Sequence, residues 1–246
     1  MKPDCLLFII MITFNRHFHF KNSMKRKKII LLVIVCLCLE LSGLQAQSVK
    51  DIDGNIYATT DIGNAVWMSE NLKTTKYNDG TPIPLVTDDK KWGSLKTPAY
   101  CWLNNNIENK EEYGALYNWY AVETKKLCPT GWHVPTNAEW GTMVAVSGDE
   151  ATAGSKMRET GMEHWNNALV NATNDFDFTA LPAGFRAFTG EFPPDANNYA
   201  IWWTTTAYDA EKVWNRGLYY TSSRLFNGYR DKKSGFSVRC VKDGKK

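Results

Sequence analysis

Apolar and polar residues alternate in short segments soon after residue 46, and turn signals separate these segments. Asp53-Gly54 and Gly63-Asn64 flank one such run, and dipeptides of this kind favour tight turns between antiparallel strands. We therefore expect strands over residues 56–60 and 65–68, arranged as a small antiparallel meander. Alternation returns later in the chain and predicts further strands over residues 176–181, 200–206, 213–220 and 235–241.

A helical pattern occupies the middle of the chain. Thr136 and Glu139 have the spacing of a capping box, in which each side chain bonds to the backbone of the other residue. The apolar stripe that follows predicts a helix ending at Gly148, and a second short helix is expected over residues 150–159. Residues 88–109 are polar and irregular, so we expect a long ordered loop there. Strands at both ends, two helices and a loop-rich middle indicate an α+β fold whose two ends meet.

The first 46 residues resemble an export signal in composition. Met24 opens a basic run, which is followed by the 11 apolar residues of Ile29–Leu39 and then by small residues up to Ala46. We interpret residues 24–46 as a signal peptide and residues 1–23 as an upstream extension of the true start. An apolar run of this length is shorter than the roughly 20 residues of a membrane-spanning helix, so no retained membrane span is expected.

The net charge of the expected domain differs from that of the full chain, because the first 46 residues, which we call the leader, are strongly basic. The chain has 29 basic and 26 acidic side chains, and seven of the basic and two of the acidic ones lie in the first 46 residues. Residues 47–246, which suit a single domain, therefore carry 22 basic against 24 acidic side chains. A mildly acidic domain without a basic stripe lacks the charge to neutralise several phosphates, so nucleic acid is not an expected partner.

Three cysteines follow the leader, and an oxidising compartment favours one disulfide among them. We expect this bond between Cys128 and Cys240, where it would join the end of the chain to its middle. On the chain-entropy model, closing a loop of this size stabilises the fold by roughly 4 to 5 kcal/mol. Cys101 is then expected to be a small buried residue, and a bond between Cys101 and Cys240 stays open as an alternative.

Five phrases along the chain resemble one bacterial family. They are WMSENL at 67–72, YGALYNW at 113–119, LCPTGWHVPTNAEW at 127–140, ALPAGFR at 180–186 and SVRCVK at 237–242. In content and order they are similar to the Fibrobacter succinogenes major paralogous domain, a family of exported bacterial proteins without an assigned biochemical activity. The resemblance covers residues 51–243.

Residues 132–140 also resemble, at a greater distance, the formylglycine-generating, sulfatase-modifying enzymes. This resemblance implies a C-type-lectin-like fold, in which the N- and C-terminal strands are adjacent and a loop-rich lobe presents the binding surface. Those enzymes bind copper through two cysteines near the chain end, whereas this sequence offers Cys240 alone there. Iron-dependent relatives use several histidines, but residues 47–246 contain two, of which we expect His133 to be structural and His164 to lie at the surface. We therefore expect no catalytic residue, metal or cofactor.

Aromatic residues are frequent after the leader, and all ten tryptophans lie there. Most should be core residues, but an exposed set could bind a sugar or a protein. Trp165-Asn166-Asn167 is similar to the calcium phrase of C-type lectins, but Asn167 replaces the carboxylate, so calcium-dependent binding is not expected. The candidate ligand-binding residues are Trp165, Asn166, Asn167, Tyr199, Trp202, Trp203 and Trp214, with Tyr208 as a further ring. Neighbouring residues of a strand point to opposite faces, so one of Trp202 and Trp203 is expected to face outward.

These patterns predict a secreted or cell-surface recognition module that is not an enzyme and whose partner is a glycan or a surface protein. Arg186 and Arg239, which recur in the resembling phrases, are expected to pair with buried acids or backbone carbonyls. One alternative is a structural subunit of an extracellular assembly. A second is a degenerate formylglycine-generating enzyme, which would need Cys101 as a reactive partner beside Cys240.

Overall fold

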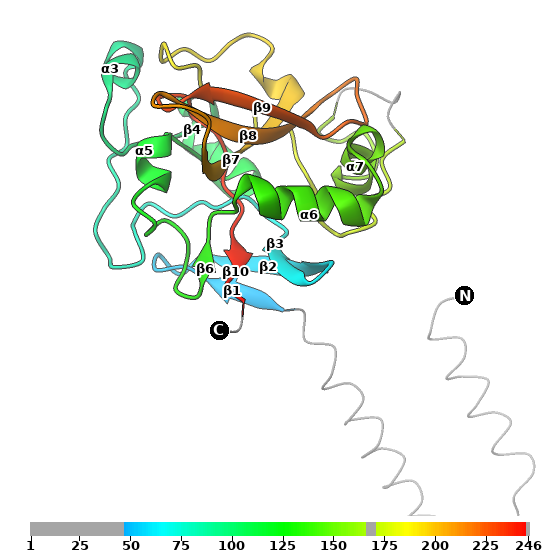
Figure 1. The fold of residues 1–246 in the computed structure, drawn as a ribbon. Coiled ribbons are helices and arrows are strands. Elements are labelled where there is room, and N and C mark those ends of the chain that lie inside the picture. Colours follow the sequence, from blue (N-terminus) through cyan, green and yellow to red (C-terminus); the bar gives the residue numbers. More distant parts are fainter. Residues whose placement is uncertain (1–46, 166–170, 245–246) are drawn as a thin grey trace, which may run out of the picture. The chain divides into compact units, whose positions relative to one another are not determined.

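A computed structural model describes residues 47–165 and 171–244 of the protein (Figure 1). The first sheet is antiparallel and has the order β1-β2-β3-β10-β6, so strands from the beginning, middle and end of this region share it. Its strands are β1 (Ser48–Lys50), β2 (Ile56–Ile62), β3 (Ala65–Met68), β6 (Trp132–His133) and β10 (Val241–Lys242). The last strand pairs with β3 and β6, and not with β1.

Two smaller sheets complete the strand content of the described residues. The three-stranded sheet β7-β8-β9 consists of Tyr199–Ala207, Lys212–Tyr219 and Phe226–Asp231, paired antiparallel. The two-stranded sheet consists of β4 (Tyr100–Trp102) and β5 (Ala115–Tyr117). Mixed helices and mostly antiparallel sheets agree with the predicted α+β class.

Helix α6 forms where the sequence predicts it. Its N-cap Thr136 accepts a hydrogen bond from the backbone of Glu139, and the Glu139 carboxylate accepts from the backbone of Thr136, which is the expected capping box. The helix ends before Gly148, whose φ of 106° suits glycine. The α-helices are α3 (Asp89–Ser94), α4 (Lys110–Tyr113), α5 (Trp119–Val122), α6 (Asn137–Ser147) and α7 (Glu150–Met157), and the 3₁₀ turns are η1 (Leu103–Asn105), η2 (Ile107–Asn109) and η3 (Ala196–Asn198).

Several element predictions need correction. Residues 88–109 are not a long loop, because Asp88 caps α3 and the apolar residues of β4 pair with β5. Residues 176–181 form no strand, and one isolated bridge at Ala180 replaces it. The predicted terminal strand 235–241 is mostly a series of isolated bridges, and β9 was missed because its sequence is largely polar.

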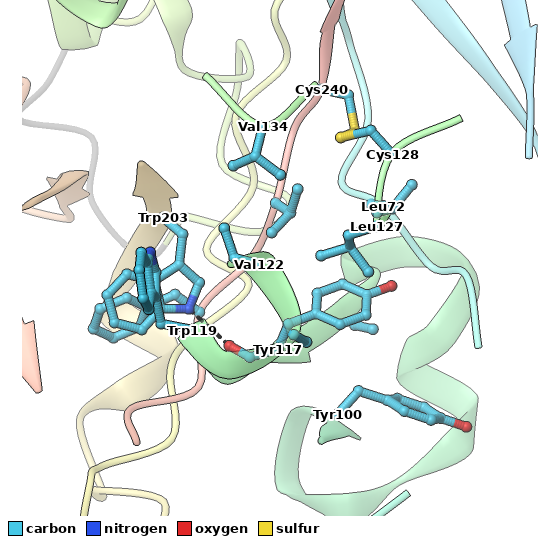
Figure 2. Packing of buried hydrophobic residues seen from close by; sticks show 14 of the residues in the cluster. Leu72, Tyr100, Tyr117, Trp119, Val122, Leu127, Cys128, Val134, Trp203 and Cys240 are labelled. Carbon is cyan, nitrogen blue, oxygen red and sulfur yellow. Dashed lines mark hydrogen bonds between the residues drawn. A yellow bond between two sulfur atoms is a disulfide. The ribbon is translucent and has the colours of Figure 1, made fainter. Parts of the chain in front are cut away.

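Strand β7 lies between two aromatic clusters, and this position buries both of its tryptophans. Trp203 belongs to the cluster that also contains Tyr117 and the disulfide cysteines, and its Nε1 donates to the Tyr117 carbonyl oxygen at 2.7 Å (Figure 2). Trp202 packs on the other face with residues of α6 and of the first sheet, including Trp140. Successive residues of a strand point to opposite faces, and here both faces are covered.

Buried arginines hold the loops around this core. Three of them, Arg158, Arg186 and Arg239, each lie over an aromatic ring and donate hydrogen bonds to backbone carbonyl groups of a segment distant in sequence. Arg158 lies 3.9 Å from the Trp165 ring, Arg186 4.5 Å from the Trp92 ring and Arg239 4.0 Å from the Phe178 ring. Burial lowers the pKa of Arg239 to about 9, which still leaves it charged at neutral pH. The arginines thereby donate hydrogen bonds to buried carbonyl groups of loops that are not paired in a sheet.

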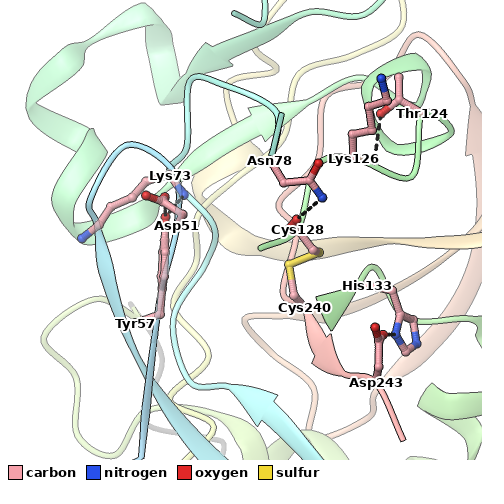
Figure 3. The surroundings of a disulfide bond; sticks show 10 residues. All are labelled: Asp51, Tyr57, Lys73, Asn78, Thr124, Lys126, Cys128, His133, Cys240 and Asp243. Atoms are coloured by element: carbon pink, nitrogen blue, oxygen red, sulfur yellow. Dashed lines mark hydrogen bonds and ion pairs between the residues drawn. A yellow bond between two sulfur atoms is a disulfide. The ribbon is translucent and has the colours of Figure 1, made fainter. Parts of the chain in front are cut away.

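The structure contains the expected disulfide between Cys128 and Cys240, which are 112 residues apart in sequence (Figure 3). The bond joins the loop before β6 to the segment before β10, next to the pairing of these two strands. The Asn78 side chain donates to the Cys128 carbonyl oxygen at 3.1 Å and ties a third segment to the same point.

Within the described part of the chain, no helix has the length and apolar character that crossing a membrane requires.

Candidate functional site

Three aromatic side chains gather at one end of the sheet β7-β8-β9, and we call them the aromatic platform: Tyr208, Trp214 and Tyr229. The rings of Tyr208 and Tyr229 are stacked, with centroids 3.9 Å apart and an interplanar angle of 7°. Trp214 lies perpendicular to both, at 5.2 Å and 5.9 Å. Tyr208 is 46% exposed and Tyr229 is 40% exposed, so this is an aromatic cluster that solvent reaches.

Strand register explains why these rings meet. Trp214 in β8 and Tyr229 in β9 are direct cross-strand partners and therefore share one face of the sheet. Tyr208 begins the turn after β7, in which the Asp209 carboxylate accepts hydrogen bonds from the backbone N–H groups of Glu211 and Lys212. This turn returns the chain into β8 and places Tyr208 on the Tyr229 ring.

The platform is polar at its edge. Interaction with the Tyr229 side chain raises the pKa of Tyr208 above its ordinary value of about 10, at which a phenol is already protonated at neutral pH, and Tyr208 offers a hydroxyl group. The Lys212 Nζ lies 5.5 Å from the centroid of the Tyr229 ring. The rings thus combine apolar faces with hydrogen-bonding groups, as binding surfaces often do.

Several of the predicted ligand-binding residues are buried in the structure and do not lie on its surface. Trp165, Trp202 and Trp203 are at most 1% exposed, so the expectation that one ring of β7 faces outward is wrong. The reason is that clusters cover both faces of β7, while Trp165 packs under Arg158 and donates to the Ala180 carbonyl. Tyr199 is half-buried against Tyr219, away from the platform. Asn166 and Asn167 lie outside the described residues.

Of the predicted rings, Trp214 and Tyr208 belong to the platform, and Tyr229 was missed. Its neighbours Asn227, Gly228, Arg230 and Asp231 give little hydrophobic signal for a strand. Only the pairing with β8 places its ring beside Trp214.

His133 is a structural histidine, as predicted. Its Nδ1 lies 2.6 Å from the Asp243 carboxylate (Figure 3). Its Nε2 lies 2.8 Å from Glu139, so His133 connects β6, α6 and the segment after β10. Burial lowers the pKa of His133, but the hydrogen bonds to Asp243 and Glu139 outweigh this effect, and its pKa is raised.

His164 differs from its prediction, because its side chain is 14% exposed and lies between carboxylates. Its Nδ1 is 2.7 Å from Glu159 and its Nε2 is 2.5 Å from Glu112. A cavity of about 330 Å³ adjoins the imidazole and is lined by polar side chains that include Glu163 and Asn104. The carboxylates around His164 come from segments that the sequence separates by about fifty residues.

Comparison with known proteins agrees with the resemblance seen in the sequence. A family model, the Fibrobacter succinogenes major domain, matches residues 60–242. The chain belongs to this family. Neither the curated proteins nor the solved structures contain a match to it. The matched region includes the disulfide, the aromatic platform and the carboxylates around His164.

Arg186 and Arg239 have structural contacts in this Fibrobacter succinogenes major domain, as predicted. Arg186 donates to the carbonyl oxygens of Val86 and Gly190 and to the Asp89 carboxylate. Arg239 donates to backbone carbonyls of the 178–179 segment and to the Asn71 side chain. Both side chains are buried, so neither presents its guanidinium to a ligand.

Cys101 is buried in a third cluster, with Trp92 and Leu116. Its neighbour Tyr100 in β4 packs in the cluster that holds Cys240, so the Cys101 thiol points to the other face of the strand. Burial raises the pKa of the Cys101 thiol to about 12, which leaves little nucleophilic thiolate at neutral pH. The structure therefore gives no support to a reactive pair of Cys101 and Cys240.

Proposed function

We propose that this Fibrobacter succinogenes major domain is an exported recognition module and that it binds glycans through its aromatic platform. The observation that carries the proposal is the exposed, stacked pair of Tyr208 and Tyr229 with Trp214 at its edge. Aromatic faces stack against the apolar faces of sugar rings, and the tyrosine hydroxyl groups supply hydrogen bonds.

Rigidity favours binding at this surface. The platform is anchored by β8 and β9, whose pairing fixes Trp214 opposite Tyr229. Aromatic side chains lose little conformational entropy on binding because they have few rotatable bonds, and here they are already packed on one another. A ligand would therefore meet a preformed surface.

A glycan array probed with the full-length chain tests the proposal. We expect Tyr208→Ala and Trp214→Ala to weaken binding of the retained glycan by about tenfold or more, as loss of an aromatic anchor does at other interfaces. Phe188→Ala is the matched control, because Phe188 is an aromatic residue of similar exposure, 49%, outside the platform. Equal binding by all variants, or no glycan binding, would contradict the proposal. Concentration-dependent assembly without glycan binding would instead favour a structural subunit.

We further propose that the fold is C-type-lectin-like and that the domain is secreted or displayed at the cell surface after removal of residues 1–46. Support for the fold is the sheet that the first and last strands share, together with the described residues 158–165 and 171–195, which contain no helix or strand. Support for export is the disulfide, which persists in oxidising compartments. Intact-mass measurement of the exported protein tests the cleavage, and an experimental structure compared with C-type lectins tests the fold.

A further inference from the structure

The group around His164 combines one imidazole with three carboxylates. Ligand atoms of Glu159, Glu163 and His164 all lie within 4.8 Å of one another. Glu112, in α4, adds a fourth group, at 2.5 Å from Nε2 of His164. The cluster therefore joins two regions of the chain at one point.

Charge at this point is unbalanced. Even with a protonated imidazole, three carboxylates leave a net charge of −2. Among the described residues, none of these carboxylates forms an ion pair with lysine or arginine, whereas nearby Glu111 pairs with Lys73 and Lys110. A divalent cation would neutralise this charge, and its attraction to the Glu159 carboxylate is strengthened because that side chain is only 18% exposed.

The two imidazole nitrogens have different roles in this arrangement. Glu112 holds Nε2, and Nδ1 is hydrogen-bonded to the Glu159 carboxylate at 2.7 Å, so a metal ion would take the place of the proton between Nδ1 and Glu159. A carboxylate that accepts from the second ring nitrogen of a ligating histidine fixes its tautomer and orientation, as around many protein metal ions. Glu112 would thus be a positioning residue, and Glu159, Glu163 and His164 would be ligands.

We propose that Glu159, Glu163 and His164 form a binding site for a divalent transition metal ion, with zinc as its representative. Imidazole together with carboxylates suits zinc better than calcium or magnesium, which prefer oxygen ligands alone. Zinc binds its nitrogen and oxygen ligands at about 2.0 to 2.2 Å, so the ligand atoms around one zinc ion lie closer to one another than 4.8 Å. The Glu163 side chain is exposed and can move toward the other two ligands to form such a site.

The site also has an open side. Three protein ligands leave a coordination position free, and such open sites bind water or an oxygen donor of a ligand. A cavity of about 330 Å³ is lined by Glu163 and His164 and also by Asn104, Asn109 and Asn197. These amides could hydrogen-bond a small polar molecule bound to the metal.

Isothermal titration of the tag-free, chelator-treated full-length chain with zinc chloride tests the proposal. We expect saturable binding of one zinc ion per chain and at least tenfold weaker binding of calcium and magnesium. His164→Gln and Glu163→Gln should weaken zinc binding by about 10- to 100-fold or more, and Glu112→Gln should weaken it by about 10- to 100-fold through loss of orientation. Because Glu163 is exposed, its substitution should leave the fold intact.

His133→Gln is the matched control. His133 also lies between two carboxylates, Glu139 and Asp243, but it lacks a third carboxylate like Glu163. We expect its substitution to leave zinc affinity unchanged. Absence of saturable zinc binding, equal affinity in Glu163→Gln and the wild type, or loss of binding in His133→Gln would each overturn the assignment.

Discussion

At the scale of single residues, buried arginine side chains donate hydrogen bonds to backbone carbonyl groups of loops that have few partners in sheets or helices. Arg158 donates to carbonyl groups at 219, 220 and 222, where the chain turns after β8. Arg186 does the same for the segment before α3, and Arg239 for residues 178–179. The guanidinium has five N–H donors in a rigid planar fork and reaches two or three carbonyls in a fixed geometry, whereas the donors of a lysine ammonium all lie on one nitrogen atom.

His133 gives a pH-dependent prediction at the same scale. Its pKa in the folded protein is raised above the ordinary value of about 6.5, so its ion pairs stabilise the fold below that value and lose this contribution as pH rises through the folded pKa. His133→Gln should therefore lower the melting temperature more at about pH 5.5 than at about pH 8.5. Melting curves of both proteins at the two pH values measure this difference. A larger effect at the higher pH would contradict it. The effect should be modest because the His133 side chain is 38% exposed.

At the scale of elements, short pieces of structure pack by close backbone contact as well as by side chains. The 187–190 turn lies directly on α3. A Cβ atom at Gly190 would lie 2.0 Å from the Asp89 carbonyl oxygen, and one at Gly93 would lie 2.4 Å from the Thr189 carbonyl oxygen. These two glycines let the turn approach the helix, and the same contact positions the carbonyl of Gly190 for Arg186.

Gly190→Ala should separate this turn from α3. We expect it to lower the free energy of unfolding by at least about 2 kcal/mol more than Gly80→Ala does, because overpacking adds to the backbone strain. Gly80 is a matched control, since its φ of +85° is also positive but no atom lies within 4 Å of a Cβ there. Urea unfolding of the two variants measures the difference. Equal destabilisation would show that backbone strain alone accounts for the effect.

At the scale of the whole molecule, the disulfide and the first sheet bring the ends of the described region together. Cys240 precedes β10, and β10 pairs with both β3 and β6. The pairing of β10 with β6 is short, because each strand has only two residues. The disulfide beside these strands keeps them from separating.

Removing the bond should therefore have a large effect. We expect Cys128→Ala combined with Cys240→Ala to lower the free energy of unfolding by roughly 4 to 5 kcal/mol, because the unfolded chain regains the entropy of an open loop of 112 residues. Urea unfolding measures this loss, and reduction of the wild type should reproduce it without affecting the double variant. A loss below about 1 kcal/mol would contradict the role we assign to the bond.

Local signals in the sequence account for the elements that were predicted well. The capping box of Thr136 and Glu139 fixes the start of α6, and turn dipeptides mark the β2–β3 hairpin. Cysteine number and placement favoured the pair that the structure contains. Each of these signals depends on residues close in sequence or on one chemical pairing, so no knowledge of the packing was needed.

The tertiary structure alone decided what is exposed and which distant residues meet. Alternation along β7 predicted one outward tryptophan, but distant segments cover both faces, so Trp202 and Trp203 are buried. Tyr229 joins Trp214 only through strand register, and Glu112 reaches His164 only through the folding of loops. The physical reason is that periodicity reports the two faces of a strand, whereas burial depends on what the rest of the chain places against each face.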